Sequence, residues 1–152
     1  MLYLITNTYF ADMKRLISLF VLLIVMLCNV GAQDKGWNDD IISFITKMYE
    51  DKLYQNYGFL QKHCTAELLK KLQNAYPYDT DGVAYATWLF RSGQQDSKPD
   101  SKGMSYIQDV KTDKNDWYIL SAVDIGWEFT KRLKVSNENG KIVIFDICPV
   151  EE

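Results

Sequence analysis

The amino-acid sequence predicts an α+β protein in which N-terminal helices pack on a curved four-stranded antiparallel sheet. Two observations lead to this fold class. From residue 37 to about residue 76, apolar residues recur every three or four positions, which is typical of amphipathic helices. In the last third of the chain they recur every second position, which is typical of half-buried strands. Helices that precede all the strands favour an α+β layout, with the helices covering one face of the sheet.

Residues 1–32 are expected to form a signal peptide for export. A short basic start, Met13-Lys14-Arg15, precedes an apolar run from Leu16 to Leu27, and Val30-Gly31-Ala32 supplies a cleavage site. The run is shorter than the roughly 20 apolar residues that a membrane-spanning helix needs. Residues 1–12 fit no part of a signal, so Met13 is an alternative start of translation. The expected location is therefore the periplasm or the outside of the cell.

Two alternatives to a cleaved signal stay open. The first is a lipoprotein modified at Cys28, although a lipid-modified cysteine normally follows a small residue and Leu27 precedes this one. The second is an uncleaved membrane anchor. Cleavage after Ala32 leaves residues 33–152, a length typical of one domain with one core and no membrane span.

Charge and cysteine content limit the partners and the chemistry. The chain has a net charge of −3, and loss of Asp12, Lys14 and Arg15 with the signal leaves a more acidic domain. Because that domain lacks a basic block, we expect no nucleic-acid partner. The two remaining cysteines, Cys64 and Cys148, either form a disulfide or stay as separate buried thiols. Their Cα separation decides between these alternatives.

The helices are expected in the first half of the domain. An apolar stripe that includes Ile41, Ile45 and Met48 predicts a helix over residues 37–57, ended by Gly58. A second helix is expected over residues 66–76, with Thr65 as its N-cap and Pro77 after its end.

The middle of the chain is expected to be less regular. Residues 79–82 predict a turn, and residues 83–90 predict a brief helix capped by Asp81. The segment 92–103 contains two glycines, a proline and three serines, so we expect a loop.

Four strands are expected after this loop, in the order 104–112, 117–123, 127–135 and 142–147. The third strand alternates apolar and polar residues and is broken by Lys131. Turns are predicted at residues 113–116 and 137–140, and the second of these contains the Asn139-Gly140 pair that favours a hairpin.

The order of elements over residues 37–148 resembles the nuclear-transport-factor-2-like superfamily, in which a bent sheet wraps round a long N-terminal helix to form a cone. Several segments are also similar to exported bacterial domains of unknown function in that superfamily. These segments are Tyr78-Asp79-Thr80-Asp81-Gly82, Ala86-Thr87-Trp88-Leu89-Phe90-Arg91, Gln95-Asp96, Trp117-Tyr118 and Val123-Asp124-Ile125-Gly126. The superfamily contains isomerases, dehydratases, binding modules and partner-binding proteins, so the fold does not select a function. The resemblance also implies that a homodimer formed through the sheet is one arrangement to consider.

No catalytic residue is assigned from the sequence. Enzymes of this superfamily work inside the cone, often with an Asp or His beside a Tyr. His63 lies just before the second helix, so we interpret it as a helix-entry or surface residue. Asp109 and Asp124 are better acid/base candidates. Asp109 is nevertheless expected to face water, and Asp124, close to Gly126, is interpreted as a solvated turn residue.

No metal or cofactor is expected. The segment Asp79-x-Asp81-Gly82 begins like a calcium loop, but Val83 and Phe90 stand where such a loop needs oxygen ligands. The sequence has no Cys/His spacing typical of zinc, no Gly-rich phosphate loop and no serine-nucleophile motif.

High aromatic content indicates either a ligand pocket or a core filled by large side chains. For a pocket, the predicted lining is Tyr85, Trp88, Trp117 and Asp124. The first functional hypothesis is a non-enzymatic module that binds a small apolar ligand in a cone-shaped pocket. The second is a protein-interaction module, such as an exported immunity or assembly factor. The third is a cone-type isomerase or lyase.

Overall fold

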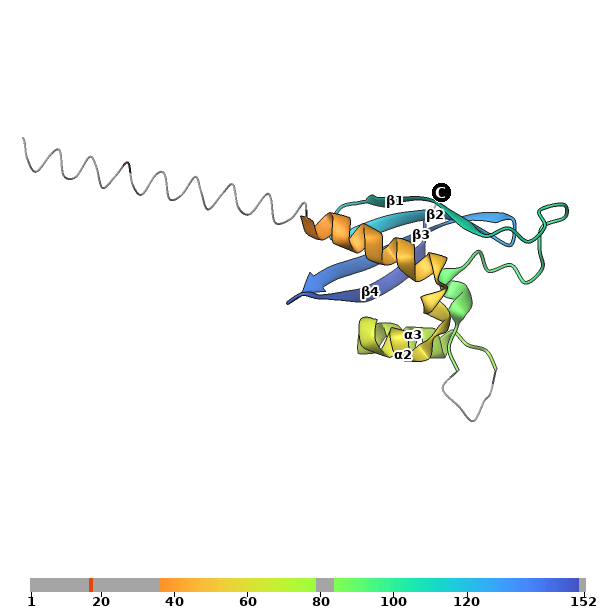
Figure 1. The fold of residues 1–152 in the computed structure, drawn as a ribbon. Helices are drawn as coiled ribbons and strands as arrows, with labels where there is room; N and C mark the ends of the chain where they lie inside the picture. The colour runs from red at the N-terminus through yellow and green to blue at the C-terminus, as the bar shows by residue number, and fades with distance from the viewer. Residues whose placement is uncertain (1–16, 18–35, 79–83, 151–152) are drawn as a thin grey trace, which may run out of the picture. The chain divides into compact units, whose positions relative to one another are not determined.

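The computed structural model describes residues 36–78 and 84–150, together with Ile17 (Figure 1). The expected signal peptide, apart from Ile17, lies outside the described residues, as do the predicted turn at 79–82 and Asp81, the predicted cap of the brief helix over 83–90. Within the described part of the chain, no helix is long and apolar enough to span a membrane. The compact unit that contains the sheet spans Asn38–Glu152.

The first predicted helix is in fact two helices with a break between them. Residues 36–50 are helical, and Lys52 then adopts a left-handed conformation with φ of 52°. A single 3-10 turn, η1 (Leu53–Gln55), leads to α2 (Tyr57–His63), which is capped by the Asn56 side chain. The predicted helix end at Gly58 is therefore wrong, because Gly58 lies inside α2.

The second predicted helix is confirmed, and the third element is shorter than expected. In α3 (Ala66–Asn74), the Thr65 hydroxyl accepts a hydrogen bond of 3.2 Å from the Leu68 amide, as an N-cap does. The predicted brief helix appears as the 3-10 turn η2 (Thr87–Phe90), preceded by Ala86 with no side-chain cap. Residues 92–103 contain no helix or strand, as predicted.

All four strands form one antiparallel sheet in sequence order, which confirms the α+β class. The strands are β1 (Tyr106–Thr112), β2 (Trp117–Asp124), β3 (Trp127–Glu138) and β4 (Lys141–Pro149). Each hairpin turns through two consecutive residues with positive φ, the geometry that matches the twist of the flanking strands. These pairs are Asn115-Asp116, Ile125-Gly126 and Asn139-Gly140.

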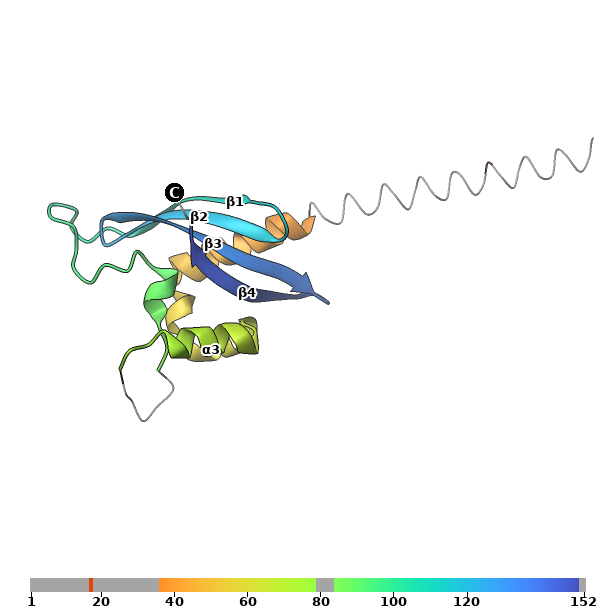
Figure 2. The ribbon, with the colours of Figure 1, turned by 180° about the vertical axis from the view of Figure 1, so that it is seen from behind.

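The hydrophobic core lies between the inner face of the sheet and the helices. Ile45 and Met48 of the 36–50 helix, together with Leu120 and Leu133 of the sheet, are fully buried in one cluster. The 36–50 helix runs along one face of the sheet, and α2 and α3 lie beside β4 (Figures 1 and 2). The Tyr118 hydroxyl ties the sheet to this helix by donating a hydrogen bond of 2.6 Å to Asn38.

The two cysteines of the domain are free thiols, so the disulfide alternative is not the one found. Cys64 forms an isolated backbone bridge with Ile144, four positions before Cys148 in β4. At about 3.3 Å per strand residue this offset is roughly 13 Å, whereas disulfide-bonded Cα atoms lie within about 7 Å. Burial raises the pKa of the Cys64 thiol to about 12.

Candidate functional site

A cavity of about 290 Å³ opens between the C-terminal end of the 36–50 helix and the end of the sheet where β2 turns into β3. Its walls combine aromatic, aliphatic and charged side chains, as ligand pockets do. The residues that matter most for its chemistry are Tyr49, Tyr54, Arg91, Ala122, Asp124 and Phe129.

Asp124 is the charged centre of this cavity. The residue is 8% exposed, and its carboxylate accepts hydrogen bonds from Arg91 Nε at 2.9 Å and Arg91 Nη2 at 3.3 Å. The Ser92 hydroxyl donates a third bond of 3.1 Å to Asp124 Oδ2. A guanidinium that binds both oxygens of a carboxylate is a strong and directional partner. The interpretation of Asp124 as a solvated turn residue is therefore wrong, because Arg91 and Ser92 cover it.

Local structure explains why Arg91 reaches Asp124. Phe90, at the end of η2, is fully buried, and its ring stacks on Tyr54 with centroids 5.9 Å apart. The Arg91 amide donates to the Trp88 carbonyl at 3.0 Å, which completes the turn. Anchoring Phe90 in the core therefore fixes the neighbouring Arg91 at the cavity wall.

Tyr49 contributes a buried hydroxyl that has no hydrogen-bond partner among the described residues. Its ring lies 5.2 Å from that of Tyr54 and 6.4 Å from that of Phe129, measured between centroids. Burial raises the pKa of Tyr49 well above its ordinary value of 10.0, and the nearby Tyr54 and Asp124 raise it further. Burial and then Asp124 also raise the pKa of Tyr54, while Arg91 acts in the opposite direction.

The loop before β1 wraps round the β2–β3 turn and holds the end of the cavity in place. The Ile125 amide donates to the Ser105 hydroxyl at 2.9 Å, and the Ile125 carbonyl accepts from the Lys98 amide at 2.9 Å. Gly126, with φ of 90°, approaches this loop so closely that an added Cβ would lie 2.2 Å from the Ser101 Cβ. These contacts stabilise the positive φ of 47° at Ile125, which is unusual for a β-branched residue.

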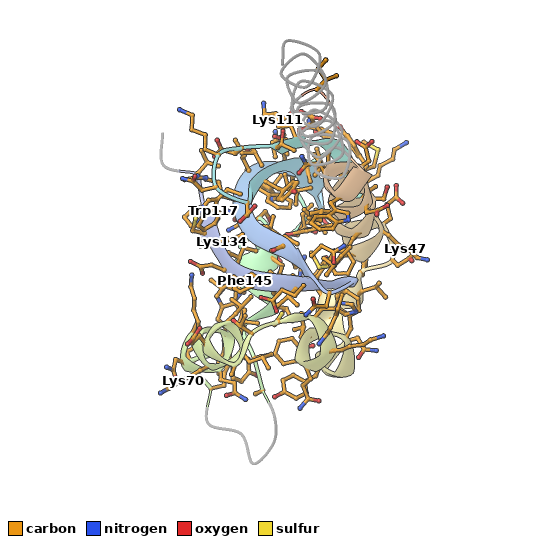
Figure 3. All side chains as sticks on the ribbon, turned by 90° about the vertical axis from the view of Figure 1, so that its left-hand side faces the viewer. Lys47, Lys70, Lys111, Trp117, Lys134 and Phe145 are labelled. Carbon is orange, nitrogen blue, oxygen red and sulfur yellow. The ribbon has the colours of Figure 1, made fainter. Side chains whose placement is uncertain are left out.

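The structure does not bring the four predicted pocket residues together, and only Asp124 among them lines this cavity. The Tyr85 hydroxyl donates to the Gln55 carbonyl, and the Trp88 ring stacks on Tyr76 with centroids 5.7 Å apart. Trp117 lies on the face of the sheet turned away from the 36–50 helix, near Lys134 and Phe145 (Figure 3). The Arg132 guanidinium covers its ring at 4.8 Å. These three aromatic residues therefore have separate packing roles.

The remaining polar candidates lie outside the cavity. His63 ends α2, where its Nδ1 lies 2.9 Å from the Ile142 carbonyl and its ring contacts both Phe44 and Phe59. Asp109 is exposed on β1, as expected. The described residues contain no group of three or more His, Cys, Asp or Glu side chains placed to hold a metal ion.

Three residues of the cavity were not predicted as site residues, namely Arg91, Tyr49 and Phe129. Tyr49 and Phe129 occupy inward-facing positions in the apolar pattern, as core residues do. The pattern therefore cannot show whether such a residue packs in the core or lines a cavity. Arg91 lies 33 positions before Asp124, so no local spacing connects the two.

The fold and cavity define a small α+β domain with a helix-covered antiparallel sheet. A solved structure with a similar fold is a protein of unknown function from Bacteroides thetaiotaomicron VPI-5482. Its TM-score is 0.52 at 20% sequence identity, and the match covers 82% of this chain and 99% of that chain. At this identity the likeness concerns the fold alone. No family model matches the chain, and the search of curated proteins gave no match.

Proposed function

We propose that this chain is a non-enzymatic binding module that holds a small, mostly apolar ligand in the cavity beside Tyr49, Phe129 and Asp124. The observation that carries the proposal is a space of about 290 Å³ that lies against the buried core and is bounded by aromatic, aliphatic and charged side chains. This volume is at the lower limit of the usual range for ligand sites, so it suits a compact molecule.

The unpartnered Tyr49 hydroxyl supports a ligand with one hydrogen-bond acceptor. A buried donor without a partner costs about 1–3 kcal/mol, and a ligand acceptor that reaches the hydroxyl after a small side-chain shift removes that cost. Ala122, Val123 and Phe129 form an apolar part of the wall, while Glu50, Lys52 and Arg91 place charges elsewhere on the lining. A neutral molecule with an apolar body and one carbonyl or ether oxygen fits this combination.

The arrangement around Asp124 supports binding over catalysis. A general base must have a lone pair free to take a proton from a substrate. Hydrogen bonds from Arg91 and Ser92 instead occupy three of the roughly four acceptor positions of the Asp124 carboxylate, so little of it is left to take a proton. The cone-type isomerase or lyase is therefore the third candidate.

A protein-interaction module, such as an exported immunity or assembly factor, is the second candidate. The observation in its favour is that Met104 and Tyr106, just before and at the start of β1, are 56% and 52% exposed. Exposed apolar side chains that lie close together are typical of protein contact sites when they form a continuous patch.

The proposal includes membership of the nuclear-transport-factor-2-like superfamily and export from the cytoplasm. The superfamily is supported by the long helix along the inner face of a four-stranded antiparallel sheet, with a cavity at one end. Export is supported by the basic start, apolar run and cleavage-site pattern of residues 13–32.

Native mass spectrometry tests the proposed function. The tagged full chain is expressed with its own N-terminal segment in its native cell type, and the protein is isolated from the envelope fraction. We expect one small molecule per chain, lost in the variant Ala122→Leu, which fills the cavity. The matched control Thr130→Val changes an exposed residue of β3 and should keep the ligand.

Two outcomes would contradict the ligand-binding proposal. A protein partner at fixed stoichiometry without any small molecule would favour the interaction module. A small molecule retained by Ala122→Leu would place the binding site elsewhere. The same spectrum gives the mass of the mature chain and hence the position of signal cleavage.

A further inference from the structure

The two edges of the sheet are covered very differently. On the β4 edge, the Thr65 amide donates to the Ile144 carbonyl at 3.0 Å, and Lys71 Nζ donates to the Ile147 carbonyl at 2.7 Å. The His63 ring lies against a third carbonyl, that of Ile142. The α2–α3 junction therefore occupies this edge. On the β1 edge, in contrast, the described part of the chain places no strand beyond β1.

The side chains of β1 separate into an inward and an outward set. Ile107 and Val110 pack against the core, and a bulge at Gln108 allows both to face inward. Asp109 and Lys111 are exposed and lie on the opposite face, two positions apart. Among the described residues, this edge therefore presents an unpaired backbone with one negative and one positive side chain on the same face.

This charge order is complementary to itself. In an antiparallel pair related by a two-fold axis at Val110, residue 109 of each strand lies opposite residue 111 of the other. Asp109 of each copy then lies beside Lys111 of the other copy, so that two ion pairs form on one face. The same register places Gln108 opposite Thr112, and both residues are polar and exposed.

We propose that two copies of this chain pair antiparallel along β1, with Asp109 and Lys111 forming reciprocal ion pairs. A free strand edge is a template for another strand, and β1 contains no proline to prevent pairing. A second copy is the occupant that these charges select, because any other strand must present the same charges in the reverse order. The contact is isologous and therefore closes as a dimer. It needs no ligand and goes beyond the proposed binding function.

Charge reversal tests the register. In Asp109→Lys, two attractive pairs become repulsive, and Lys111→Asp has the same effect with opposite charges. Sedimentation equilibrium on the purified full chain should show a dimer, with a dissociation constant raised by about tenfold or more in each single variant. The double variant Asp109→Lys/Lys111→Asp should restore the dimer, because its charges are again complementary. Mixing the two single variants should give a heterodimer.

A matched control separates this contact from a general effect of charge. Glu128→Lys makes the same change of charge at an exposed position of β3, away from the β1 edge, and should leave the dimer unchanged. Circular dichroism checks that each variant is folded. A monomeric wild-type protein would overturn the proposal. So would a dimer insensitive to both reversals, or single variants that neither the double variant nor mixing restores.

Discussion

The interior of this domain is closely packed at one end of the sheet and open at the other. The inward-facing row of β2 runs from Tyr118 through Leu120 to Ala122, from large side chains to a small one. Around Leu133 and its neighbours the core is fully buried, whereas beyond Ala122 a cavity of about 290 Å³ remains. The same inward-facing row of β2 therefore contributes to both the core and the cavity. Large side chains fill the core, and the small side chain of Ala122 leaves the cavity open.

The two ends also differ in polarity. Two aromatic hydroxyls and the Arg91–Asp124 ion pair lie at the open end, and the Tyr49 hydroxyl has no partner among the described residues. Polar groups held away from water contribute little to stability unless they are hydrogen-bonded. We therefore expect the filled end to provide most of the stability and the open end to provide binding.

The largest loss of stability is expected from a substitution that creates a cavity at the filled end. Leu133 is fully buried, so Leu133→Ala should lower the free energy of unfolding by about 3–5 kcal/mol. Urea denaturation measures this loss. Ligand binding measured well below the unfolding midpoint should persist, because Leu133 does not line the cavity. If the folded Leu133→Ala variant lost ligand binding as well as stability, the two ends of the sheet would not be separate in function.

The next largest loss of stability is expected when the ion pair at the open end is broken. Arg91→Met leaves Asp124 nearly buried without its cation, and removing one partner of a buried pair costs about 3–5 kcal/mol. Because the Arg91 side chain is 28% exposed, solvent screens the pair and we expect about 2 kcal/mol. The variant Arg91→Met/Asp124→Leu should recover part of this loss in the same urea measurement. No recovery would indicate that Arg91 acts through packing.

These elements also show what the sequence could predict. Periodicity predicted the α+β class, all four strands and the Thr65-capped helix, because each depends on local spacing. The break at Lys52 was missed, because no glycine or proline marks the left-handed residue. The site was predicted only at Asp124. Its partner Arg91 lies 33 positions earlier in the chain, directly after the turn η2. Trp88 packs on Tyr76 and Trp117 packs under Arg132, and no local pattern predicts these contacts.

A smaller effect of opposite sign is expected at Tyr49. Tyr49→Phe removes a buried hydroxyl without a partner among the described residues, so stability near neutral pH should rise by about 1 kcal/mol while ligand affinity falls. A loss of stability in thermal unfolding would indicate that the hydroxyl has a favourable partner in the free protein.

The same variant has a signature at alkaline pH. The raised pKa of Tyr49 means that the folded state holds its phenol proton more tightly than the unfolded state does. This contribution to stability is complete below about pH 10, the ordinary pKa, and is lost as the pH rises toward the folded-state pKa. Tyr49→Phe should therefore unfold at a higher pH than the wild type, and Tyr54→Phe should show a weaker shift of the same kind. An unchanged alkaline midpoint in Tyr49→Phe would contradict the assigned burial.

The most direct test of ligand binding is an NMR titration of the full chain with acetophenone, a neutral aromatic probe with one carbonyl acceptor. We predict saturable chemical-shift changes grouped at Tyr49, Ala122 and Phe129, and weaker binding of ethylbenzene, which lacks the acceptor. In Ala122→Leu the changes should disappear while thermal stability rises, because three added carbons fill empty space. Changes grouped instead at Trp88 or Trp117, or equal binding by the filled variant, would contradict a ligand site at the open end of the sheet.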